Sequence, residues 1–162
     1  MNKSNVDKIR FGRDIKKVRE EKGVSQIEFA KEFQKFILSR YGVSIRVSQA
    51  AWGYYETGNR IPNLDRFYEL CAFAKLKPKD YMIDFDFAND EIGAFDKAAF
   101  RAALLDTRRE HNLTQKQAAE KSDVPIAVYE RVEKSGIANL RNYRLLCKAF
   151  ALDPNDFLYV KK

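Results

Sequence analysis

The chain contains two copies of one sequence pattern, and this repeat limits the folds it can adopt more than any other feature. Residues 11–30 (FGRDIKKVREEKGVSQIEFA) align without gaps on residues 100–119 (FRAALLDTRREHNLTQKQAA). Residues 61–81 align on residues 137–157 in the same way. Between these blocks the first copy carries 13 more residues than the second, most of them between Ala30 and Val47. A repeat of this kind indicates two small domains of one fold in tandem.

Both copies have the signals of helices. Each contains a capping box, in which a hydroxyl side chain and a Glu or Gln three residues later satisfy helix N–H groups. The two boxes are Ser25 with Glu28 and Thr114 with Gln117. Apolar residues recur at helical spacing after Asn63 and Asn139, which are both N-cap residue types. Strand-like alternation is confined to VSIRV (43–47), so the sequence predicts an all-α protein.

Charge is distributed unevenly between the two copies. We expect a first domain at 1–83 and a second at 97–162, separated by an acidic linker at 84–96 (DFDFANDEIGAFD). The net charge is +7, and residues 1–81 hold 17 Lys and Arg against 10 Asp and Glu. Residues 82–162 hold 13 of each kind. The first half is therefore the half that we expect to face phosphates.

Composition excludes several classes of protein. Hydrophobic residues make up 45% of the chain, which is enough for a packed core. No apolar run approaches the roughly 18 residues that a membrane span needs, and the basic N-terminus has no apolar stretch behind it. We therefore expect a cytoplasmic protein, of a bacterial or phage nucleoid-associated kind, with no membrane contact. Cys71 and Cys147 are expected to be reduced core residues.

No pattern in the sequence points to catalysis. There is no glycine-rich phosphate loop, no metal-ligand cluster and no nucleophile with a base nearby. The single histidine, His111, is expected to be exposed at the end of a helix. The sequence therefore predicts that the protein is not an enzyme, with no catalytic residues, no cofactor and no metal.

Residues 47–62 (VSQAAWGYYETGNRIP) predict a short helix with an unusual outward face. Ser48 is expected to cap the helix, Trp52 to face the core, and Gly58 to end it in the left-handed conformation. The outward residues are small or carry an amide or hydroxyl group: Gln49, Ala50, Gly53 and Tyr54. Such a face lets a helix backbone approach base edges in a DNA major groove. Glutamine can bond to adenine through two hydrogen bonds, and alanine can contact a thymine methyl group.

The order SQ…A…VSQxxxxxYExGxRxP resembles the lambda-repressor-like, or Xre-type, helix-turn-helix family. The resemblance covers most of residues 7–81 and, more loosely, 97–158. It implies two tandem bundles of about five helices each, the third helix of a bundle entering the major groove of double-stranded DNA. It also implies base readout by the four outward residues named above. The phosphate contacts are expected from Gln26, Arg46, Ser48, Asn59 and Arg60.

The second copy departs from this pattern in the corresponding helix. Pro125, Ile126 and Glu130 stand where the first copy has Ser48, Gln49 and Gly53. An exposed isoleucine cannot read a base by hydrogen bonds, and Glu130 and Glu133 would bring negative charge towards phosphates. We therefore expect the second copy to keep the fold and lose groove reading. Its surface around Ile126 and Glu130 would then serve self-association or a protein partner, unless Ile126 simply packs into its own bundle.

The extra residues of the first copy, 31–46, predict a second helix about two turns longer than its counterpart, ended by Gly42. Three roles for this insertion stay open: a larger core, a dimer surface, or placement of Arg40 and Arg46 beside the DNA backbone.

The leading hypothesis is a sequence-specific DNA-binding transcriptional regulator, a repressor that acts as a homodimer. The alternative is a protein-binding module, an antitoxin or phage-encoded inhibitor. In that case the C-terminal domain engages a protein partner and DNA binding is autoregulatory. Non-specific nucleic-acid binding is a third hypothesis, which the small, amide-bearing face argues against.

Overall fold

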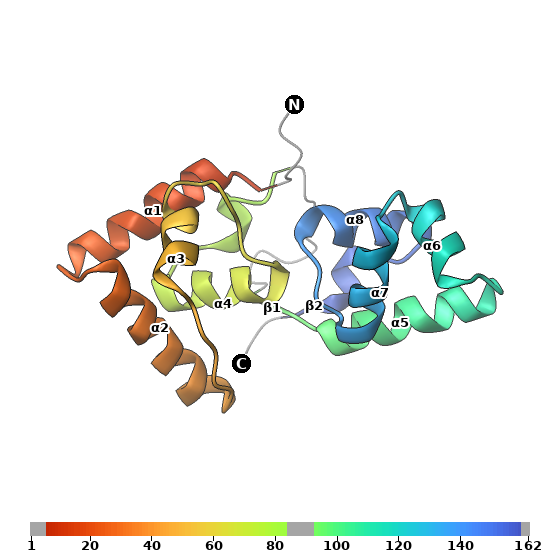
Figure 1. Ribbon diagram of the computed structural model, residues 1–162, viewed down its shortest axis with the longest axis horizontal. Helices are drawn as coiled ribbons and strands as arrows, with labels where there is room; N and C mark the ends of the chain where they lie inside the picture. Colours follow the sequence, from red (N-terminus) through yellow and green to blue (C-terminus); the bar gives the residue numbers. More distant parts are fainter. Residues whose placement is uncertain (1–5, 84–92, 160–162) are drawn as a thin grey trace. The chain divides into compact units, whose positions relative to one another are not determined.

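The computed structural model describes residues 6–83 and 93–159 (Figure 1). The chain divides into two compact units, the first comprising residues 6–62 with 66–83 and the second residues 93–159 with 63–65. Within the described residues, each unit contains four α-helices and one short 3-10 helix. The prediction of an all-α fold with about five helices per unit is therefore confirmed. Most of the predicted linker, residues 84–92, lies outside the described residues.

The first unit is a bundle in which the short third helix packs against the first two. Its elements are α1 (Lys8–Glu21), α2 (Gln26–Tyr41), α3 (Gln49–Glu56), α4 (Leu64–Ala74) and the 3-10 helix η1 (Pro78–Asp80). An isolated antiparallel bridge joins Val6 to Met82. Because α3 contacts both α1 and α2, its inner face is buried and its outer face is left on the surface.

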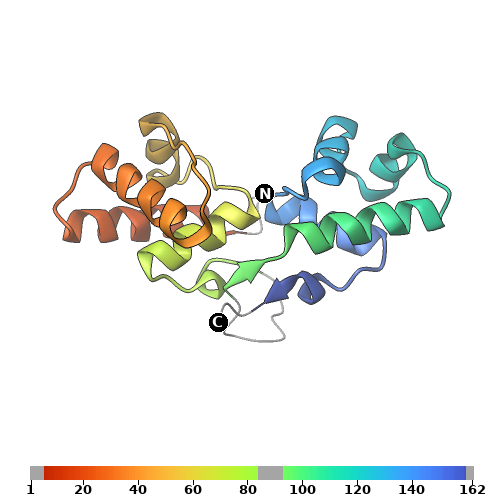
Figure 2. The ribbon, with the colours of Figure 1, turned by 90° about the horizontal axis from the view of Figure 1, so that it is seen from below.

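The second unit repeats this order of helices. Its elements are β1 (Ala94–Phe95), α5 (Lys97–Glu110), α6 (Gln115–Ser122), α7 (Ile126–Ser135), α8 (Leu140–Ala149), the 3-10 helix η2 (Pro154–Phe157) and β2 (Leu158–Tyr159). The two strands pair antiparallel, with Ala94 opposite Tyr159 and Phe95 opposite Leu158 (Figure 2). The sequence did not predict these strands, since two residues are too few for an alternating pattern to show. Ala94 and Phe95 fall within the predicted linker, yet both are buried.

Each unit has its own apolar core. In the first unit the fully buried side chains include Phe11, Ile15, Phe29, Phe33 and Trp52. In the second they include Phe100, Leu104, Tyr129, Tyr143 and Leu146. Cys71 and Cys147 are buried free cysteines, as predicted. Burial of aromatic and aliphatic side chains at helical spacing is what drives each bundle together.

Most of the predicted helix starts are confirmed. Both capping boxes are formed, with Ser25 and Thr114 as the N-cap residues. The side chain of Asn139 accepts a hydrogen bond from the backbone N–H of Asn142, which begins α8. The cap predicted at Asn63 is wrong, because the Oδ1 atom of Asn63 is buried without a hydrogen bond.

The insertion lengthens α2, as the sequence predicts. Helix α2 has 16 residues, whereas α6 has eight. Helix α2 ends at its C-cap residue Gly42, which has a φ of 66°. Ile37 from the added turns is buried, and the ring centroid of Phe36 lies 5.4 Å from that of Phe73. The VSIRV segment is neither helix nor strand. The insertion therefore enlarges the core, the first of its three suggested roles.

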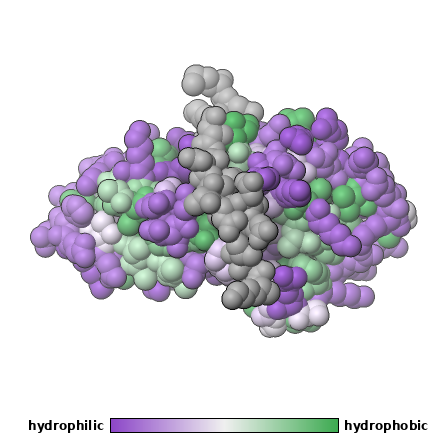
Figure 3. All heavy atoms as spheres, turned by 180° about the vertical axis from the view of Figure 1, so that it is seen from behind, coloured by the Kyte–Doolittle hydropathy of each residue, from purple (hydrophilic) through white to green (hydrophobic). Residues whose placement is uncertain are grey.

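On one face of the molecule (Figure 3), apolar surface occurs in small groups rather than as one large patch. On the face shown in Figure 3, hydrophobic atoms lie in separate groups bordered by hydrophilic ones. The most exposed large apolar side chains include Ile9, Leu38 and Val43. Within residues 6–83 and 93–159, no helix has both the length and the apolar character needed to cross a bilayer.

Candidate nucleic-acid interface

The ends of α3 are fixed by local hydrogen bonds. The Oγ atom of Ser48 accepts a hydrogen bond from the backbone N–H of Ala51 at 3.1 Å, which confirms the predicted N-cap. After the C-cap residue Thr57, Gly58 adopts a φ of 71°. A Cβ atom at Gly58 would lie 2.9 Å from the carbonyl oxygen of Lys8, so glycine is required there for space as well as for conformation.

The inner face of α3 is held by aromatic packing. Trp52 is fully buried, as predicted, and its ring meets that of Phe29 edge to face at a centroid distance of 5.1 Å. The indole Nε1 donates a hydrogen bond of 2.9 Å to Glu56 Oε1. A buried indole N–H needs such a partner, and here the partner lies one turn away on the same helix.

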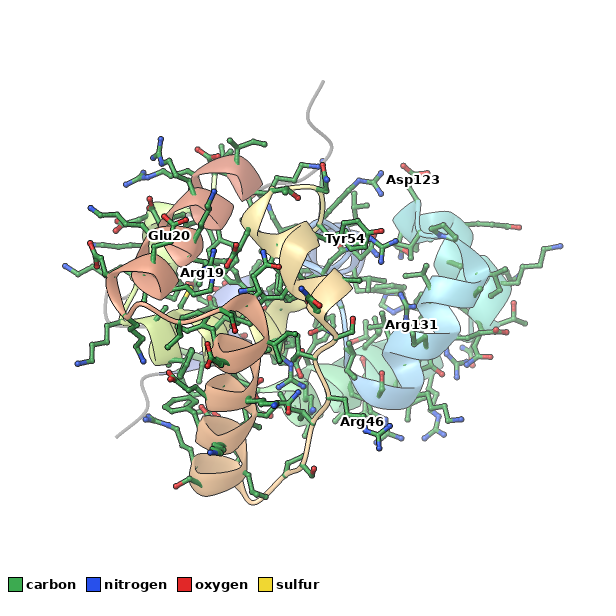
Figure 4. All side chains as sticks on the ribbon, turned by 60° about the vertical axis from the view of Figure 1, so that its left-hand side comes forward. Arg19, Glu20, Arg46, Tyr54, Asp123 and Arg131 are labelled. Atoms are coloured by element: carbon green, nitrogen blue, oxygen red, sulfur yellow. The ribbon has the colours of Figure 1, made fainter. Side chains whose placement is uncertain are left out.

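Glu56 also connects α3 to α1 and α2. Arg19 on α1 donates from Nε to Glu56 Oε1 at 2.5 Å and from Nη2 to Oε2 at 3.0 Å. Gln26, the first residue of α2, donates from Nε2 to Glu56 Oε2 at 2.8 Å. The side chain of Glu56 is only 3% exposed and that of Arg19 13%. In Figure 4, Arg19 lies between α1 and α3. The carboxylate therefore fixes the orientation of α3 relative to both neighbouring helices.

The protonation state of this cluster follows from its contacts. Burial raises the pKa of Glu56, but hydrogen bonds from Arg19, Gln26 and Trp52 outweigh burial, so its pKa lies below the ordinary value. The hydrogen bond to Glu56 raises the pKa of Arg19. The pair is therefore charged at neutral pH, and removal of one partner would leave a buried charge without compensation.

The second unit contains the same arrangement. Arg108 on α5 donates to both carboxylate oxygens of Glu133 on α7, at 2.7 and 2.8 Å. Gln115, the first residue of α6, donates to Glu133 Oε1 at 3.1 Å. The prediction that Glu133 carries negative charge towards phosphates is therefore wrong, because this side chain is 6% exposed and paired with arginine. Glu130 is exposed, so for that residue the expected negative charge towards phosphates stays a prediction.

The ion pair that connects the two helices was not predicted from the sequence. The alignment of residues 11–30 on residues 100–119 places Arg19 opposite Arg108, but it does not indicate Glu56 as the partner of Arg19. The signal was present, because the alignment that places Gln49 opposite Ile126 also places Glu56 opposite Glu133. An arginine and a glutamate that recur at matching positions of both copies indicate an ion pair. Periodicity along a single helix does not reveal such a pair, because its members lie on different helices.

The outer face of α3 contains the residues predicted to read bases. Gln49 and Ala50 are exposed, Gly53 is partly exposed and Tyr54 is 42% exposed. Figure 4 shows Tyr54 on the side of α3 that faces away from α1. The structure therefore brings these four residues together on one surface.

Gly53 has no internal reason to be glycine. Its backbone is helical, and a Cβ atom added there would meet only Gln26 Oε1, at 4.0 Å. By contrast, a Cβ atom at Gly12 would lie 2.3 Å from the carbonyl oxygen of Tyr55. Glycine inside a helix costs about 1 kcal/mol relative to alanine. The cost at Gly53 is not offset by packing within the protein.

The residues predicted to contact phosphates lie around α3. Arg46, Ser48, Asn59 and Arg60 are exposed, whereas Gln26 is partly exposed and its amide is bonded to Glu56. Arg46 lies in the segment before α3 (Figure 4). Arg60 differs from the others, because its guanidinium carbon lies over the Tyr54 ring at 4.8 Å from the centroid.

The corresponding surface of the second unit has another chemistry. Pro125 precedes α7 without a side-chain cap, and Ile126 is 41% exposed. A groove of about 650 Å³ lies beside Ile126. Its other lining residues are Lys116, Ala119, Glu120, Asp123, Val124, Pro125 and Arg141. The alternative in which Ile126 packs into its own bundle is therefore wrong for this residue.

The described residues contain no obvious site for a metal ion. In residues 6–83 and 93–159, no group of three or more His, Cys, Asp or Glu side chains is arranged to hold one. His111 is exposed, as predicted, and its Nδ1 atom lies 2.8 Å from the carbonyl oxygen of Thr107.

Comparison with protein-family models finds a match to one part of the chain. Residues 104–157 match a helix-turn-helix family model, a range that begins within α5 and ends with η2. No curated protein and no solved structure matches the chain. The match supports a DNA-binding regulator of the helix-turn-helix class, and such a class is consistent with a protein that is not an enzyme.

The match lies in the second unit, although the sequence resemblance was more specific in the first. The second unit keeps an eight-residue α6 and a short turn before α7. In the first unit, the 16-residue α2 and the segment at 42–48 separate the corresponding parts of the motif.

Proposed function

We propose that the protein is a sequence-specific DNA-binding transcriptional repressor whose first unit reads the major groove with α3. The observation that carries this proposal is Gly53. A helical glycine with no internal packing reason leaves space on the outer face of α3 for something external to approach closely. Gln49 and Ala50, one turn earlier on the same face, have the size and the hydrogen-bonding groups that base edges require.

The charges around α3 support a nucleic-acid ligand. The only acidic residue of α3 is Glu56, which is buried and paired with Arg19. The outer face of α3 therefore carries no carboxylate that would repel phosphates. Arg46 before the helix and Arg60 after it add positive charge at the two ends. Each phosphate that a protein neutralises releases counterions, so affinity is expected to fall as salt concentration rises.

The buried ion pair has a supporting role in this proposal. Arg19 and Gln26 hold Glu56 from two helices, so α3 is presented as a rigid element rather than a mobile one. Rigid presentation lowers the entropy lost on binding. Ser48 and Asn59 would contact phosphates next to α3. Gln26, the first residue of α2, would contact a phosphate at the start of that helix.

We propose that the protein reads its operator as a homodimer. One unit with an eight-residue reading helix covers a half-site, and symmetric pairing of two chains would double the contacts. Selection of bound duplexes from a random pool tests this proposal directly. An inverted repeat enriched by the full chain is expected, and retention of DNA without any enriched sequence would refute specific reading.

The substitution Gln49→Ala tests the assignment of α3. Loss of two hydrogen bonds to one base is expected to cost about 1–3 kcal/mol and to relax preference at one base pair. Binding is measured against the selected operator and against duplexes changed at single positions. Gln117→Ala is the matched control, because the side-chain Oε1 atom of Gln117 accepts a hydrogen bond from the backbone N–H of Thr114 in a capping box. Equal discrimination by Gln49→Ala and the unmodified protein would refute the assignment.

A second candidate function is protein binding through α7 of the second unit. It is favoured by the exposed Ile126 beside a groove and by the exposed Glu130, which opposes phosphate contact. Self-association through this surface would form the homodimer proposed for the repressor. Binding of a different protein, as in an antitoxin or a phage-encoded inhibitor, would make DNA binding autoregulatory. Measuring the oligomeric state of the full chain in solution distinguishes self-association from binding of a different protein.

A further inference from the structure

We propose that Arg60 is a specificity-determining residue that reads a guanine, and that Tyr54 is the positioning residue that holds it. This inference rests on the proposed function, since it needs α3 in the major groove. It changes the role of Arg60 from the phosphate contact expected from the sequence to a contact with a base edge. It also makes the ring of Tyr54, rather than its hydroxyl group, the important part of that side chain.

The position of the Arg60 side chain is the first observation. Its guanidinium carbon lies 4.8 Å from the centroid of the Tyr54 ring, within the range of a cation–π contact. Tyr54 belongs to the outer face of α3, together with Gln49 and Gly53. Arg60 is therefore held over the surface proposed to enter the groove, although its own backbone lies beyond the end of the helix.

The backbone between the two residues is also fixed. The N–H of Arg60 donates to the carbonyl oxygen of Tyr54 at 3.1 Å, and the N–H of Gly58 donates to that of Tyr55 at 3.1 Å. The Thr57 hydroxyl donates to the carbonyl oxygen of Gly53 at 2.9 Å. These bonds tie the turn back onto α3, so the Arg60 side chain begins from a defined point.

The donors of Arg60 are not used by a carboxylate. Among residues 6–83, Arg19 pairs with Glu56, Arg66 with Glu69 and Arg10 with Asp14, whereas Arg60 forms no ion pair. A ring covers only one face of a guanidinium, and its N–H groups point outward in the guanidinium plane. The acceptors that match two parallel N–H groups in the major groove are O6 and N7 of guanine.

The test compares Arg60→Lys, Arg60→Ala, Tyr54→Phe, Tyr54→Leu and the double variant Arg60→Lys with Tyr54→Leu on the operator selected by the unmodified full chain. Lysine keeps the charge for a phosphate but loses the planar pair of donors. Phenylalanine keeps the ring and loses only the hydroxyl group. Each protein is titrated with the operator, with single base-pair changes, and with duplexes that carry 7-deazaguanine, which lacks the N7 acceptor. The dependence of affinity on salt is measured in parallel, and Arg109→Lys on α5 is the matched control.

Arg60→Lys and Tyr54→Leu are both expected to lose about 5- to 150-fold in discrimination at one and the same guanine. Tyr54→Phe is expected to retain it, and the double variant to lose no more than Arg60→Lys alone, because the two side chains act together. The salt dependence of Arg60→Lys should be unchanged.

Two results would overturn the inference while leaving the proposed function intact. In the first, Arg60→Lys keeps full guanine discrimination while Arg60→Ala weakens all sequences equally and lowers the salt dependence, as for a phosphate contact. In the second, Tyr54→Phe loses discrimination as strongly as Tyr54→Leu, which would assign reading to the hydroxyl group. Failure of the unmodified chain to discriminate any sequence would instead refute the proposed function itself.

Discussion

Replacing Gly53 by alanine should make the first unit more stable and its DNA binding weaker. Alanine is favoured over glycine inside a helix by about 0.8–1.0 kcal/mol. The new Cβ atom would meet only Gln26 Oε1 at 4.0 Å, an ordinary contact, so no strain offsets this gain. The free energy of unfolding should therefore rise by up to about 1 kcal/mol, which corresponds to roughly 4–8 °C in the melting temperature of a domain of this size.

Fluorescence of Trp52 measures this effect in the first unit alone. Trp52 is the single tryptophan of the chain and is fully buried there, so urea unfolding followed at this residue reports on its surroundings. Gly12→Ala is the matched control, since its Cβ atom would lie 2.3 Å from the carbonyl oxygen of Tyr55 and 2.8 Å from that of Glu56. That variant should lose about 1–3 kcal/mol through overpacking.

Operator binding by Gly53→Ala is the second half of the test. A methyl group inserted into a close-packed contact costs about 1–3 kcal/mol, so affinity should fall by about 5- to 150-fold although the protein is more stable. Unchanged affinity would refute the reasoning that Gly53 leaves space for DNA. A lower free energy of unfolding would refute the reasoning that glycine has no internal function there.

Two further predictions concern other residues. Because the pKa of Glu56 is lowered in the folded protein, its contribution to stability should be complete above about pH 4.3 and lost as the pH falls through the folded value. Glu56→Gln should flatten this acid-dependent loss of the urea midpoint measured at Trp52, and an unaltered pH profile would contradict the role of the ion pair. Ile126→Asp should convert a dimer of the full chain into a monomer, as measured by sedimentation velocity. The change places a charge on the apolar surface proposed for self-association. The helix itself should still form, because a negative charge is favourable at the start of a helix. A dimer that survives this change would exclude self-association through α7.

Local patterns in the sequence predicted most of the helices and their ends. Ser25, Ser48 and Thr114 form the caps that their spacing indicates, and Gly42 and Gly58 adopt the left-handed conformations expected of helix ends. These features depend on hydrogen bonds between residues a few positions apart, which is why one sequence is enough to predict them. The exposed face of Gln49, Ala50, Gly53 and Tyr54 follows from helical periodicity in the same way.

The sequence alone determined the class of fold, the two repeated units and the four residues on the outer face of α3. The tertiary structure decided what depends on residues far apart in the chain. It paired Glu133 with Arg108 rather than with phosphates, bonded the Gln26 amide to Glu56, and held Arg60 over Tyr54. Periodicity within a helix indicates which face a side chain occupies, but not which partner stands opposite. A carboxylate, an amide or a guanidinium acquires its function from that partner, and the packing of helices against one another is what supplies it.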